Sequence, residues 1–442
     1  MTKNNRVRPR KLKGFRDYAP DAALTRRKIT DVTWETARRA GFQPIVTPAL
    51  EYSETLLGSG SQDTDKEIYG FEDHGGRQVA LRFDLTMSFA RFVAENQGTL
   101  IMPFKKVQIG DSWRGEKPQK GRFREFCQAD LDIVGTDSLM ADVEVIASLH
   151  EIIGRILPGS YSMLLGNRVI LSALIRACMP GLQGGENAAL IALDKLAKIG
   201  RQGVIDLLEK LPGGESAGAE KILAVLEDRT EEGDTNLDRV EKLVDEPTRP
   251  EIARLRETAG LLRAGRGNDR GRIVVDLSIA RGLGYYTGIV FETFVDDLPD
   301  FGSISSGGRY NQLVSRFSSR EVPGVGGSVG VDRLLAALEE LKVQVQPDSG
   351  NGLRVFVAVA SPEARAQAFD VALRLRRAGI TTDIGMQDKL AKQFKFADRS
   401  GFDRVVTIGS DELANGVYTV KDLKTGTELK DQPLAGLEEQ FR

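Results

Sequence analysis

The chain has 442 residues, enough for two or three domains, and its 41% hydrophobic and 28% charged residues are ordinary for a globular protein. Its formal net charge is −2, so no global positive field draws it to nucleic acid or membrane, and any such contact needs a local patch. Two cysteines and two histidines leave little material for a disulfide framework, a zinc site or histidine-based catalysis.

The sequence also indicates where the protein works. It contains no apolar run long enough to span a membrane. Its N-terminus, MTKNNRVRPRKLKG, is basic but lacks the apolar core of a signal peptide, and we expect a short disordered arm. Cys127 and Cys178 lie in different contexts, which suits a reducing compartment. We therefore expect a cytoplasmic protein.

In chain order, the first third of the sequence alternates helical and strand-like patterns. Residues 20–41 have apolar side chains near helical spacing and predict an amphipathic helix, followed by an extended segment broken by Pro48. Residues 77–86, RQVALRFDLT, predict a strand that leads into a helix. Residues 103–114 and 123–135 predict two strands, and the basic Gly- and Pro-containing loop between them indicates an antiparallel hairpin.

The rest of the chain predicts an insertion and a second domain. After the helical pattern MADVEVIASLHEIIGRIL, residues 165–268 are rich in helical patterns with Gly-rich breaks, and we expect a helical insertion there. Strand patterns return at 271–294. Beyond a polar linker, strands alternate with helices, which is typical of a small α/β domain. The predicted domains are 1–345 and 352–442.

The strand at 123–135 predicts two faces of different chemistry, because side chains alternate along a strand. One face has Phe123, Cys127, Ala129, Leu131 and Ile133 and suits a core. The other presents, in order, Arg122, Arg124, Phe126, Gln128, Asp130 and Asp132. Guanidinium groups suit phosphates, an aromatic ring can stack on a base, and amide and carboxylate groups suit a small cationic molecule. Such a face can hold a nucleotide and an amino acid end to end, although a solvated strand face has a similar pattern.

Three further segments are candidates for binding. Asp84 and Thr86 point the same way if they lie on a strand and can then hold an ammonium group, but Asp84 is equally suited to cap the following helix. RGLGYYTG from Arg281 and SSGGRY up to Tyr310 place glycines beside an arginine and tyrosines, where a backbone can approach a ligand. GVGGSVGVDRLL fails the dinucleotide fingerprint, so its glycines indicate either close packing or a helix that brings Arg333 to a phosphate.

These segments resemble a known family. The hairpin and GVGGSVGVDRLL resemble motifs 2 and 3 of the class II aminoacyl-tRNA synthetases, and GFQPIVTPALEY is similar to motif 1. RGLGYYTG and SSGGRY resemble the two signature segments of the histidyl-tRNA synthetase family, and the C-terminal segment resembles its anticodon-binding domain. The resemblance covers almost the whole chain. It implies an α/β (α+β) fold with an antiparallel class II catalytic core, a helical insertion and a C-terminal α/β anticodon-binding domain.

The resemblance also implies a reaction and its participants. Histidine and ATP, with Mg²⁺ entering on ATP and no protein ligand assigned to it, form histidyl-adenylate, and the histidyl group passes to the 3′ end of tRNA(His). Motif 1 implies a homodimer. A basic stripe on a predicted helix is a candidate tRNA contact or else a solvated face. The stripe consists of Lys389, Lys392, Lys395 and Arg399.

The resemblance assigns roles to residues by motif. Arg114 and Arg281 would be catalytic, holding the α-phosphate, and both would lie near histidine. ATP would be held by Arg114, Glu116, Arg122, Phe126 and Arg333. Histidine would be held by Asp84, Thr86, Arg114, Gln128, Asp132, Arg281, Tyr285, Tyr286 and Tyr310. No residue is expected to bind a resident metal ion.

Two positions depart from the family pattern, and two other functions compete. Gly284 and Asn311 stand where the family commonly has Asp, and the change at Gly284 removes a residue expected to support the tyrosines locally. One competitor is a non-catalytic paralogue, the regulatory subunit of ATP phosphoribosyltransferase. The other is a tRNA-binding or regulatory module with a synthetase-like domain. The complete C-terminal segment and the four motif arginines, Arg114, Arg122, Arg281 and Arg333, favour the synthetase.

Overall fold

The computed structural model describes residues 7–57, 66–182, 184–227, 234–265, 271–279, 286–343 and 352–441. The chain divides into two compact units, Met1–Val345 and Gln346–Arg442. Arg281, Gly284 and Tyr285 lie outside the described residues.

The first unit is built on a large sheet. In the described residues this sheet has eight strands in the order β1-β5-β6-β11-β10-β9-β7-β8. Neighbours are antiparallel except β1 with β5 and β7 with β8. The strands are β1 (Gln43–Pro44), β5 (Phe104–Trp113), β6 (Glu125–Val134), β11 (Gly324–Gly330), β10 (Ser305–Arg309), β9 (Ile289–Val295), β7 (Tyr161–Asn167) and β8 (Gly271–Val275). The β5–β6 pair is the antiparallel hairpin that the sequence predicts.

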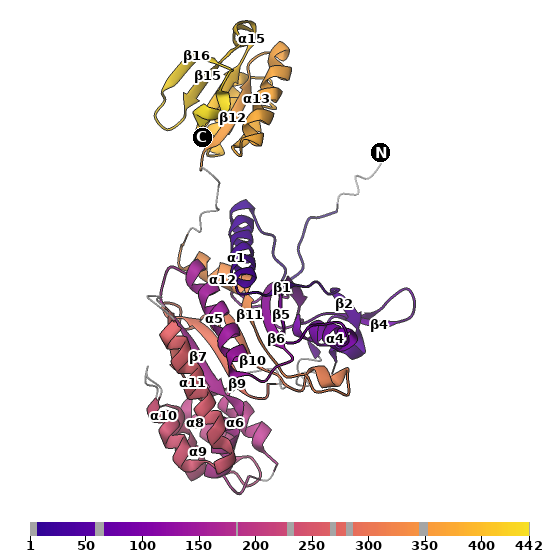
Figure 1. Cartoon of the computed structure of the whole chain (residues 1–442), viewed down its shortest axis with the longest axis vertical. Coiled ribbons are helices and arrows are strands. Elements are labelled where there is room, and N and C mark those ends of the chain that lie inside the picture. The colour runs from indigo at the N-terminus through magenta and orange to yellow at the C-terminus, as the bar shows by residue number, and fades with distance from the viewer. Residues whose placement is uncertain are drawn as a thin grey trace. The chain divides into compact units, whose positions relative to one another are not determined.

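Three helices cover one face of this sheet (Figure 1). They are α1 (Pro20–Arg39), α5 (Leu139–Ile156) and α12 (Val331–Glu340). Their apolar sides share one core with Cys127, Ala129, Leu131 and Ile133 of β6. The face of β6 that is predicted to be apolar therefore does enter the core, and the polar face points to the opposite side of the sheet.

A smaller layer lies on the opposite side of the hairpin. It contains a three-stranded sheet and two helices, namely β2 (Leu50–Tyr52), β4 (Gln78–Leu81), β3 (Gly70–Glu72), α2 (Ser53–Leu56) and α4 (Thr86–Asn96). Phe83, Met87 and Phe89 of this layer pack in one core with Phe104 of β5 and Tyr310. The polar side chains of β6 thus lie beside the edge of this second core.

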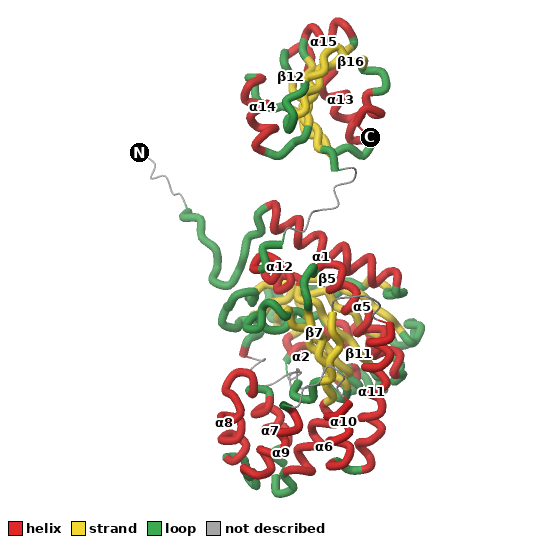
Figure 2. The backbone as a smooth tube through the Cα atoms, turned by 90° about the vertical axis from the view of Figure 1, so that its left-hand side faces the viewer, coloured by secondary structure: helices red, strands yellow, loops and turns green. Residues whose placement is uncertain are grey.

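The helical segment forms one end of the first unit (Figures 1 and 2). Its helices are α6 (Arg168–Cys178), α7 (Glu186–Leu193), α8 (Leu196–Glu209), α9 (Ser216–Leu226), α10 (Asp234–Leu243) and α11 (Arg249–Gly265). The expected start at 165 is three residues early, because β7 continues to Asn167, whose side chain then caps α6 through the amides of Val169 and Ile170. Helix α11 returns to contact α5, β7 and β8.

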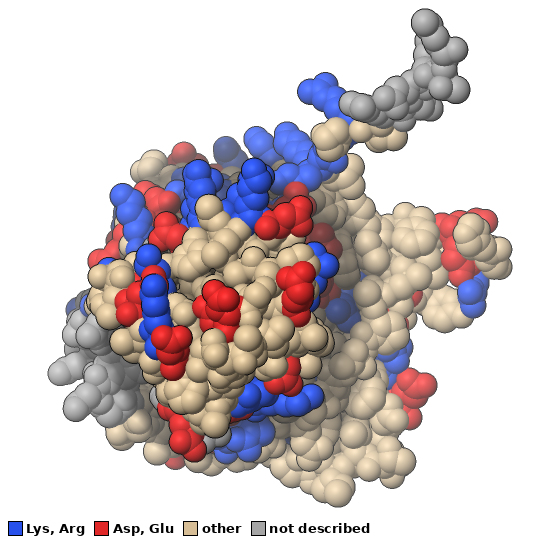
Figure 3. Space-filling model, turned by 90° about the horizontal axis from the view of Figure 1, so that it is seen from above, with Lys and Arg blue, Asp and Glu red and all other residues tan. Residues whose placement is uncertain are grey.

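The second unit is a five-stranded sheet in the order β13-β12-β14-β15-β16. Its elements are β12 (Arg354–Val359), α13 (Arg365–Arg377), β13 (Thr381–Ile384), α14 (Leu390–Arg399), β14 (Arg404–Ile408), α15 (Ser410–Asn415), β15 (Val417–Asp422) and β16 (Glu428–Pro433). Acidic and basic side chains are interspersed on the face shown in Figure 3, as the net charge of −2 leads one to expect. No helix in the described ranges has the length and apolar character needed to cross a membrane.

Candidate active site

The polar face of β6 lies in the middle of the large sheet, and register brings three strands together there. Asp132 is opposite Lys106 of β5 and Gly326 of β11, and Asp130 is opposite Gln108 and Ser328. The segments SSGGRY and GVGGSVG therefore contribute the central strands β10 and β11 and are not turns, which the sequence did not predict. At Gly326 a Cβ atom would lie 1.8 Å from Asp132 Oδ1, so glycine makes room for this carboxylate.

The carboxylate of Asp132 is held by a buried cation and a phenol. Lys106 Nζ lies 2.6 Å from Asp132 Oδ2, and both side chains are almost completely buried. The Tyr310 hydroxyl donates to Asp132 Oδ1, and Tyr310 itself is buried. Buried ionised groups need such partners, because burial removes their hydration. Asp132 is therefore fixed in place, and Tyr310 lies behind it as its support.

Asp84 does not lie on a strand. Strand β4 ends at Leu81 and α4 begins at Thr86, so the expected shared strand face of Asp84 and Thr86 is wrong. Asp84 Oδ1 instead accepts a hydrogen bond of 3.0 Å from the amide of Met87, as a helix cap does. Asp84 Oδ2 is buried and has no hydrogen-bond partner among the described residues, and burial raises the pKa of this carboxyl group. The cap thus leaves one acceptor oxygen free.

Gln128 and Asp130 are joined by Ser328 of β11. Gln128 Nε2 donates to Ser328 Oγ at 3.1 Å, and Ser328 also hydrogen-bonds the carboxylate of Asp130. Gln128 Oε1 and Asp130 Oδ1 are buried and have no hydrogen-bond partner in the part of the chain that the structure describes. Asp130 has the parity of Gln128 and Asp132 in the sequence, yet the family motif assigns it no role.

The other end of this face is basic and more exposed. Arg114 Nε donates to the carbonyl of Phe83 at 3.0 Å, and its guanidinium carbon lies 4.9 Å from the centroid of the Phe126 ring. A cation over an aromatic face is an attractive contact, so these two residues form one unit. Glu116 lies on the loop before β6, where its carboxylate is 3.5 Å from Arg122 Nη1.

Two predicted residues come from other parts of the fold. Arg333 at the start of α12 donates through Nη2 to the carbonyl of Phe301 at 2.6 Å. Tyr286 packs over β10, where a Cβ atom on Gly308 would lie 2.9 Å from its ring. The structure thus brings Arg114, Phe126 and the buried acidic residues onto one sheet face, and Arg281 and Tyr285 lie outside the described residues.

Asp332, next to Arg333, is a positioning residue that the sequence did not reveal. Its buried carboxylate accepts from the amide of Cys127 at 2.6 Å, from the Tyr18 hydroxyl at 2.6 Å and from Arg26 Nε at 3.2 Å. It therefore ties the start of α1 and α12 to the motif 2 strand. No spacing in the sequence signals this role, because its partners are far away in the chain.

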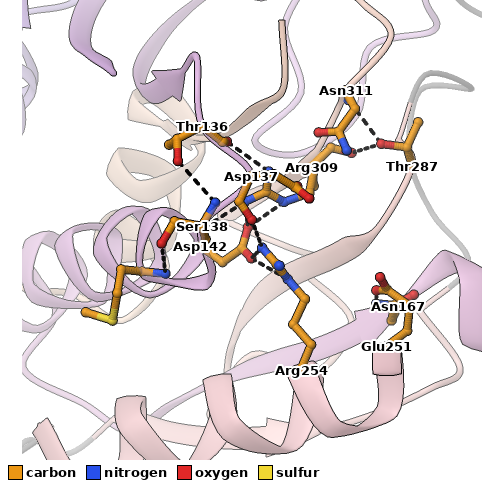
Figure 4. A network of polar contacts seen from close by, with 11 residues as sticks. Thr136, Asp137, Ser138, Asp142, Asn167, Glu251, Arg254, Thr287, Arg309 and Asn311 are labelled. Carbon is orange, nitrogen blue, oxygen red and sulfur yellow. Dashed lines mark hydrogen bonds and ion pairs between the residues drawn. The ribbon is translucent and has the colours of Figure 1, made fainter. Parts of the chain in front are cut away.

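Arg309 precedes Tyr310 and anchors its strand in a polar network (Figure 4). Its side chain is buried and lies 2.8 Å from Asp142 of α5, and it also donates to Asp137 Oδ1 at 3.0 Å. Arg254 of α11 bonds the other oxygen of Asp142 at 2.6 Å. Thr287, next to Tyr286, donates to the Arg309 carbonyl and accepts from the amide of Asn311. The tyrosines are thus tied through Arg309 and Asp142 to the helical segment.

The basic stripe of the second unit lies on a helix. Lys392, Lys395 and Arg399 are exposed on α14, and Lys389 is its N-cap residue. The buried Gln393 on the opposite side exchanges hydrogen bonds with the backbone of Val359 and so fixes the orientation of the helix.

Comparison with known proteins accounts for this arrangement. The profile described as histidyl-tRNA synthetase matches residues 14–334, and one described as an anticodon binding domain matches residues 354–442. The chain belongs to the histidyl-tRNA synthetase family. The resemblance found in the motifs and the predicted fold class are both confirmed.

Members of this family resemble the chain over its full length. A histidine–tRNA ligase of Rhodopirellula baltica is 40% identical over 95% of this chain and 94% of its own length. A histidine–tRNA ligase of Wolinella succinogenes is 39% identical over 96% of this chain and 95% of its own length. The histidyl-tRNA synthetase crystal structure from Nostoc sp. PCC 7120 has a TM-score of 0.84, 30% identity and 99% coverage of both chains. A Bacillus halodurans structure described as an ATP phosphoribosyltransferase regulatory subunit/histidyl-tRNA synthetase shares the fold at 24% identity, with a TM-score of 0.75 and coverage of 91% and 98%.

Family membership identifies the chain as an enzyme of the aminoacyl-tRNA synthetase class. In this histidyl-tRNA synthetase core, motif 2 is the β5–β6 hairpin, and motif 3 is β11 with α12. The first departure from the family pattern, Gly284, lies outside the described residues. At the second, Asn311, the backbone amide donates to Thr287 Oγ1 at 3.0 Å, while the side-chain Oδ1 is buried and has no hydrogen-bond partner within the described ranges.

Proposed function

We propose that this site joins histidine to ATP as histidyl-adenylate with release of pyrophosphate, and then transfers the histidyl group to the 3′ end of tRNA(His) with release of AMP. The proposal rests on one observation. A single sheet face has arginines and an aromatic ring at one end and buried acceptor groups at the other. A nucleotide and an amino acid fit such a face only in one direction.

At the basic end, we assign Arg114 to the α-phosphate and the histidine carboxylate. Phe126 would stack on adenine through the ring face that Arg114 leaves open, and Glu116 would accept from the adenine amino group. Arg122 and Arg333 would bind the outer phosphates by exchanging their present partners, Glu116 and the Phe301 carbonyl, for phosphate oxygens. Guanidinium–phosphate hydrogen bonds are stronger than neutral ones, which favours this exchange.

At the acidic end, Asp84 and Gln128 would accept from the α-ammonium group through the oxygens that have no partner in the described residues. Thr86, at the first turn of α4, would complete that contact. Asp132 would bind the imidazole end, with Tyr286 as a wall and Tyr310 acting through Asp132. Arg281 and Tyr285 are assigned from the family motif alone, to the α-phosphate and the imidazole.

The chemistry requires positioning and charge stabilisation more than proton transfer. Attack of the histidine carboxylate on the α-phosphorus builds up negative charge on phosphate oxygens, which fixed arginines stabilise. A scarcity of histidine and cysteine is therefore no obstacle. We infer that Mg²⁺ enters with ATP, because this ion is usually bound through substrate phosphates and water.

We also propose that the protein works as a cytoplasmic homodimer. In and beside the segment that resembles motif 1, Val46, Leu50 and Tyr52 are exposed, as is Phe71 of β3. Tyr52 and Phe71 are both in register with Val79 of β4, so they share one row of this small sheet. Exposed apolar side chains that cluster in this way favour a protein–protein interface. For tRNA, the α14 stripe is the proposed contact in the second unit.

The decisive experiment is amino-acid-dependent ATP–pyrophosphate exchange with the purified protein and each of the twenty amino acids. We expect exchange with histidine alone, followed by charging of tRNA(His). An absence of exchange with every amino acid would support a non-catalytic paralogue. Exchange that depends on another amino acid would contradict the assignment of the acidic end.

A further inference from the structure

Several buried side-chain oxygens around this sheet face have no hydrogen-bond donor in the described residues, and three of them belong to residues at the proposed amino acid end of the site. The three are Asp84 Oδ2, Gln128 Oε1 and Asp130 Oδ1. The parent side chains are at most 9% exposed. Leaving a buried acceptor without a donor is costly, so such a group indicates a donor that arrives with a ligand. A primary ammonium group has three donors and a positive charge, and it therefore matches this set.

The hydrogen bond to Ser328 determines which atom of the Gln128 amide is available to a ligand. A serine hydroxyl has one hydrogen to donate, and when Asp130 is ionised its carboxylate can only accept this hydrogen. The Ser328 oxygen is then free to accept from Gln128 Nε2, as the 3.1 Å contact shows. The carbonyl oxygen of Gln128 therefore does not bond Ser328 and is available to accept a hydrogen bond from a ligand. The charge of Asp130 thus fixes the orientation of a neutral amide two residues away.

We propose that Asp130 is a further histidine-binding residue, which accepts from the α-ammonium group beside Asp84 and Gln128, and that Ser328 is its positioning residue. This inference rests on the proposed function, because it assumes that histidine is the amino acid bound. It adds a second carboxylate to the ammonium end of the pocket. Asp132, by contrast, already contacts Lys106 and Tyr310, and its remaining lone pairs are assigned to the imidazole end of histidine.

The electrostatic surroundings of Asp130 agree with this role. Burial raises the pKa of Asp130 to about 7, against the attraction of Lys106 on β5, while Asp132 and Asp84 raise it further. Arg82, which follows β4, is a further cation that interacts with it. A bound ammonium group adds positive charge and lowers this pKa, so histidine binding and ionisation of Asp130 favour each other.

The test compares ligands that differ in one group. Histidinol keeps the ammonium and imidazole groups but lacks the carboxylate, and imidazolepropanoate keeps the carboxylate and imidazole but lacks the ammonium. Both are measured as inhibitors of histidine-dependent ATP–pyrophosphate exchange by the full-length protein. The variants are Asp130→Asn and Ser328→Ala. Ser306→Ala is the matched control, because Ser306 is the neighbour of Ser328 on β10 and is exposed.

In Asp130→Asn we expect the KM for histidine and the inhibition constant of histidinol to rise about tenfold to a hundredfold, because a charged hydrogen bond is removed. Ser328→Ala should raise both about tenfold, because the Gln128 amide is no longer oriented. The KM for ATP and the inhibition constant of imidazolepropanoate should stay within about twofold in both variants, and Ser306→Ala should match the native protein.

Three results separate the possible failures. A native protein without histidine-dependent exchange would overturn the proposed function itself. A normal native protein with unchanged histidinol binding in both variants would overturn the role of Asp130 and Ser328. Equal weakening of both inhibitors would show a general distortion and would also overturn it. If Asp130→Asn does not fold, the two inhibitors measured on Ser328→Ala decide the question.

Discussion

Replacing Asp142 by asparagine should destabilise the first unit by about 3 kcal/mol, near the lower limit for breaking a buried ion pair. The side chain is fully buried and meets Arg309 and Arg254 through different oxygens. Asparagine has almost the same size, so the change leaves no cavity, but it removes the charge and replaces one acceptor oxygen by an NH2 donor that faces an arginine. The change leaves the guanidinium group of Arg309, whose side chain is 4% exposed, without its buried counter-charge.

The magnitude follows from what Arg309 retains. Removing one partner of a buried pair costs about 3–5 kcal/mol. Arg309 keeps hydrogen bonds to Asp137 Oδ1 at 3.0 Å and to the carbonyls of Thr136 and Ser138 at 3.3 and 3.2 Å, which points to the lower value. Arg254 is 23% exposed and can be hydrated, so it adds little.

Urea unfolding followed by tryptophan fluorescence measures this loss. Both tryptophans, Trp34 and Trp113, belong to the first unit, so the signal reports on that unit alone. The control is Asp238→Asn, which removes an exposed pair with Arg256 and should cost less than about 1 kcal/mol. A loss in Asp142→Asn no larger than in the control would refute the view that this network holds the strand of Tyr310 in place.

Four further predictions concern the site and the tRNA interface. Gly326→Ala should displace Asp132, because the added Cβ would lie 1.8 Å from its carboxylate, and exchange assays should show a raised KM for histidine. Arg281→Ala should abolish histidine-dependent exchange while the thermal unfolding midpoint stays near native. The unfolding free energy of the Asp130→Asn protein minus that of the unliganded native protein should increase by about 2–4 kcal/mol from pH 4 to pH 7. Burial raises the pKa of Asp130 to about 7, so the native protein loses stability as this buried carboxyl group ionises, whereas asparagine does not titrate. Alanine at all four positions of the α14 stripe should weaken tRNA binding and reduce its salt slope by about 0.9 for each phosphate that is no longer neutralised, whereas an unchanged slope would exclude the stripe from the interface.

Local patterns predicted much of the core. The strict alternation of apolar and polar residues in CQADLDI, from Cys127 to Ile133, predicted both the strand and its buried face, because an apolar residue at every second position can satisfy only one side of a sheet. The C-terminal alternation of strands and helices was also evident in the sequence. Strand β16, with the sequence ELKDQP, was missed, because an exposed edge strand has no apolar side to reveal it.

The Gly-rich strands β10 and β11 could not be predicted from local patterns. Glycine has low strand propensity, and it is used here because its neighbours across the sheet need the space. Gly326 yields its space to Asp132 and Gly308 to Tyr286, and these neighbours are distant in sequence. Only the register of the folded sheet brings them together.

The sequence by itself determined the family, the order of the motifs and the residues with the chemistry to bind phosphate and an amino acid. The tertiary structure decided which hydrogen-bonding atoms of those residues have no partner among the described residues. Asp132 is already paired with Lys106, and one oxygen of Asp84 caps α4, whereas Asp130 keeps an acceptor that the motif does not predict. The reason is that a hydrogen-bond partner depends on distance in space, and strands far apart in the chain supply the partners.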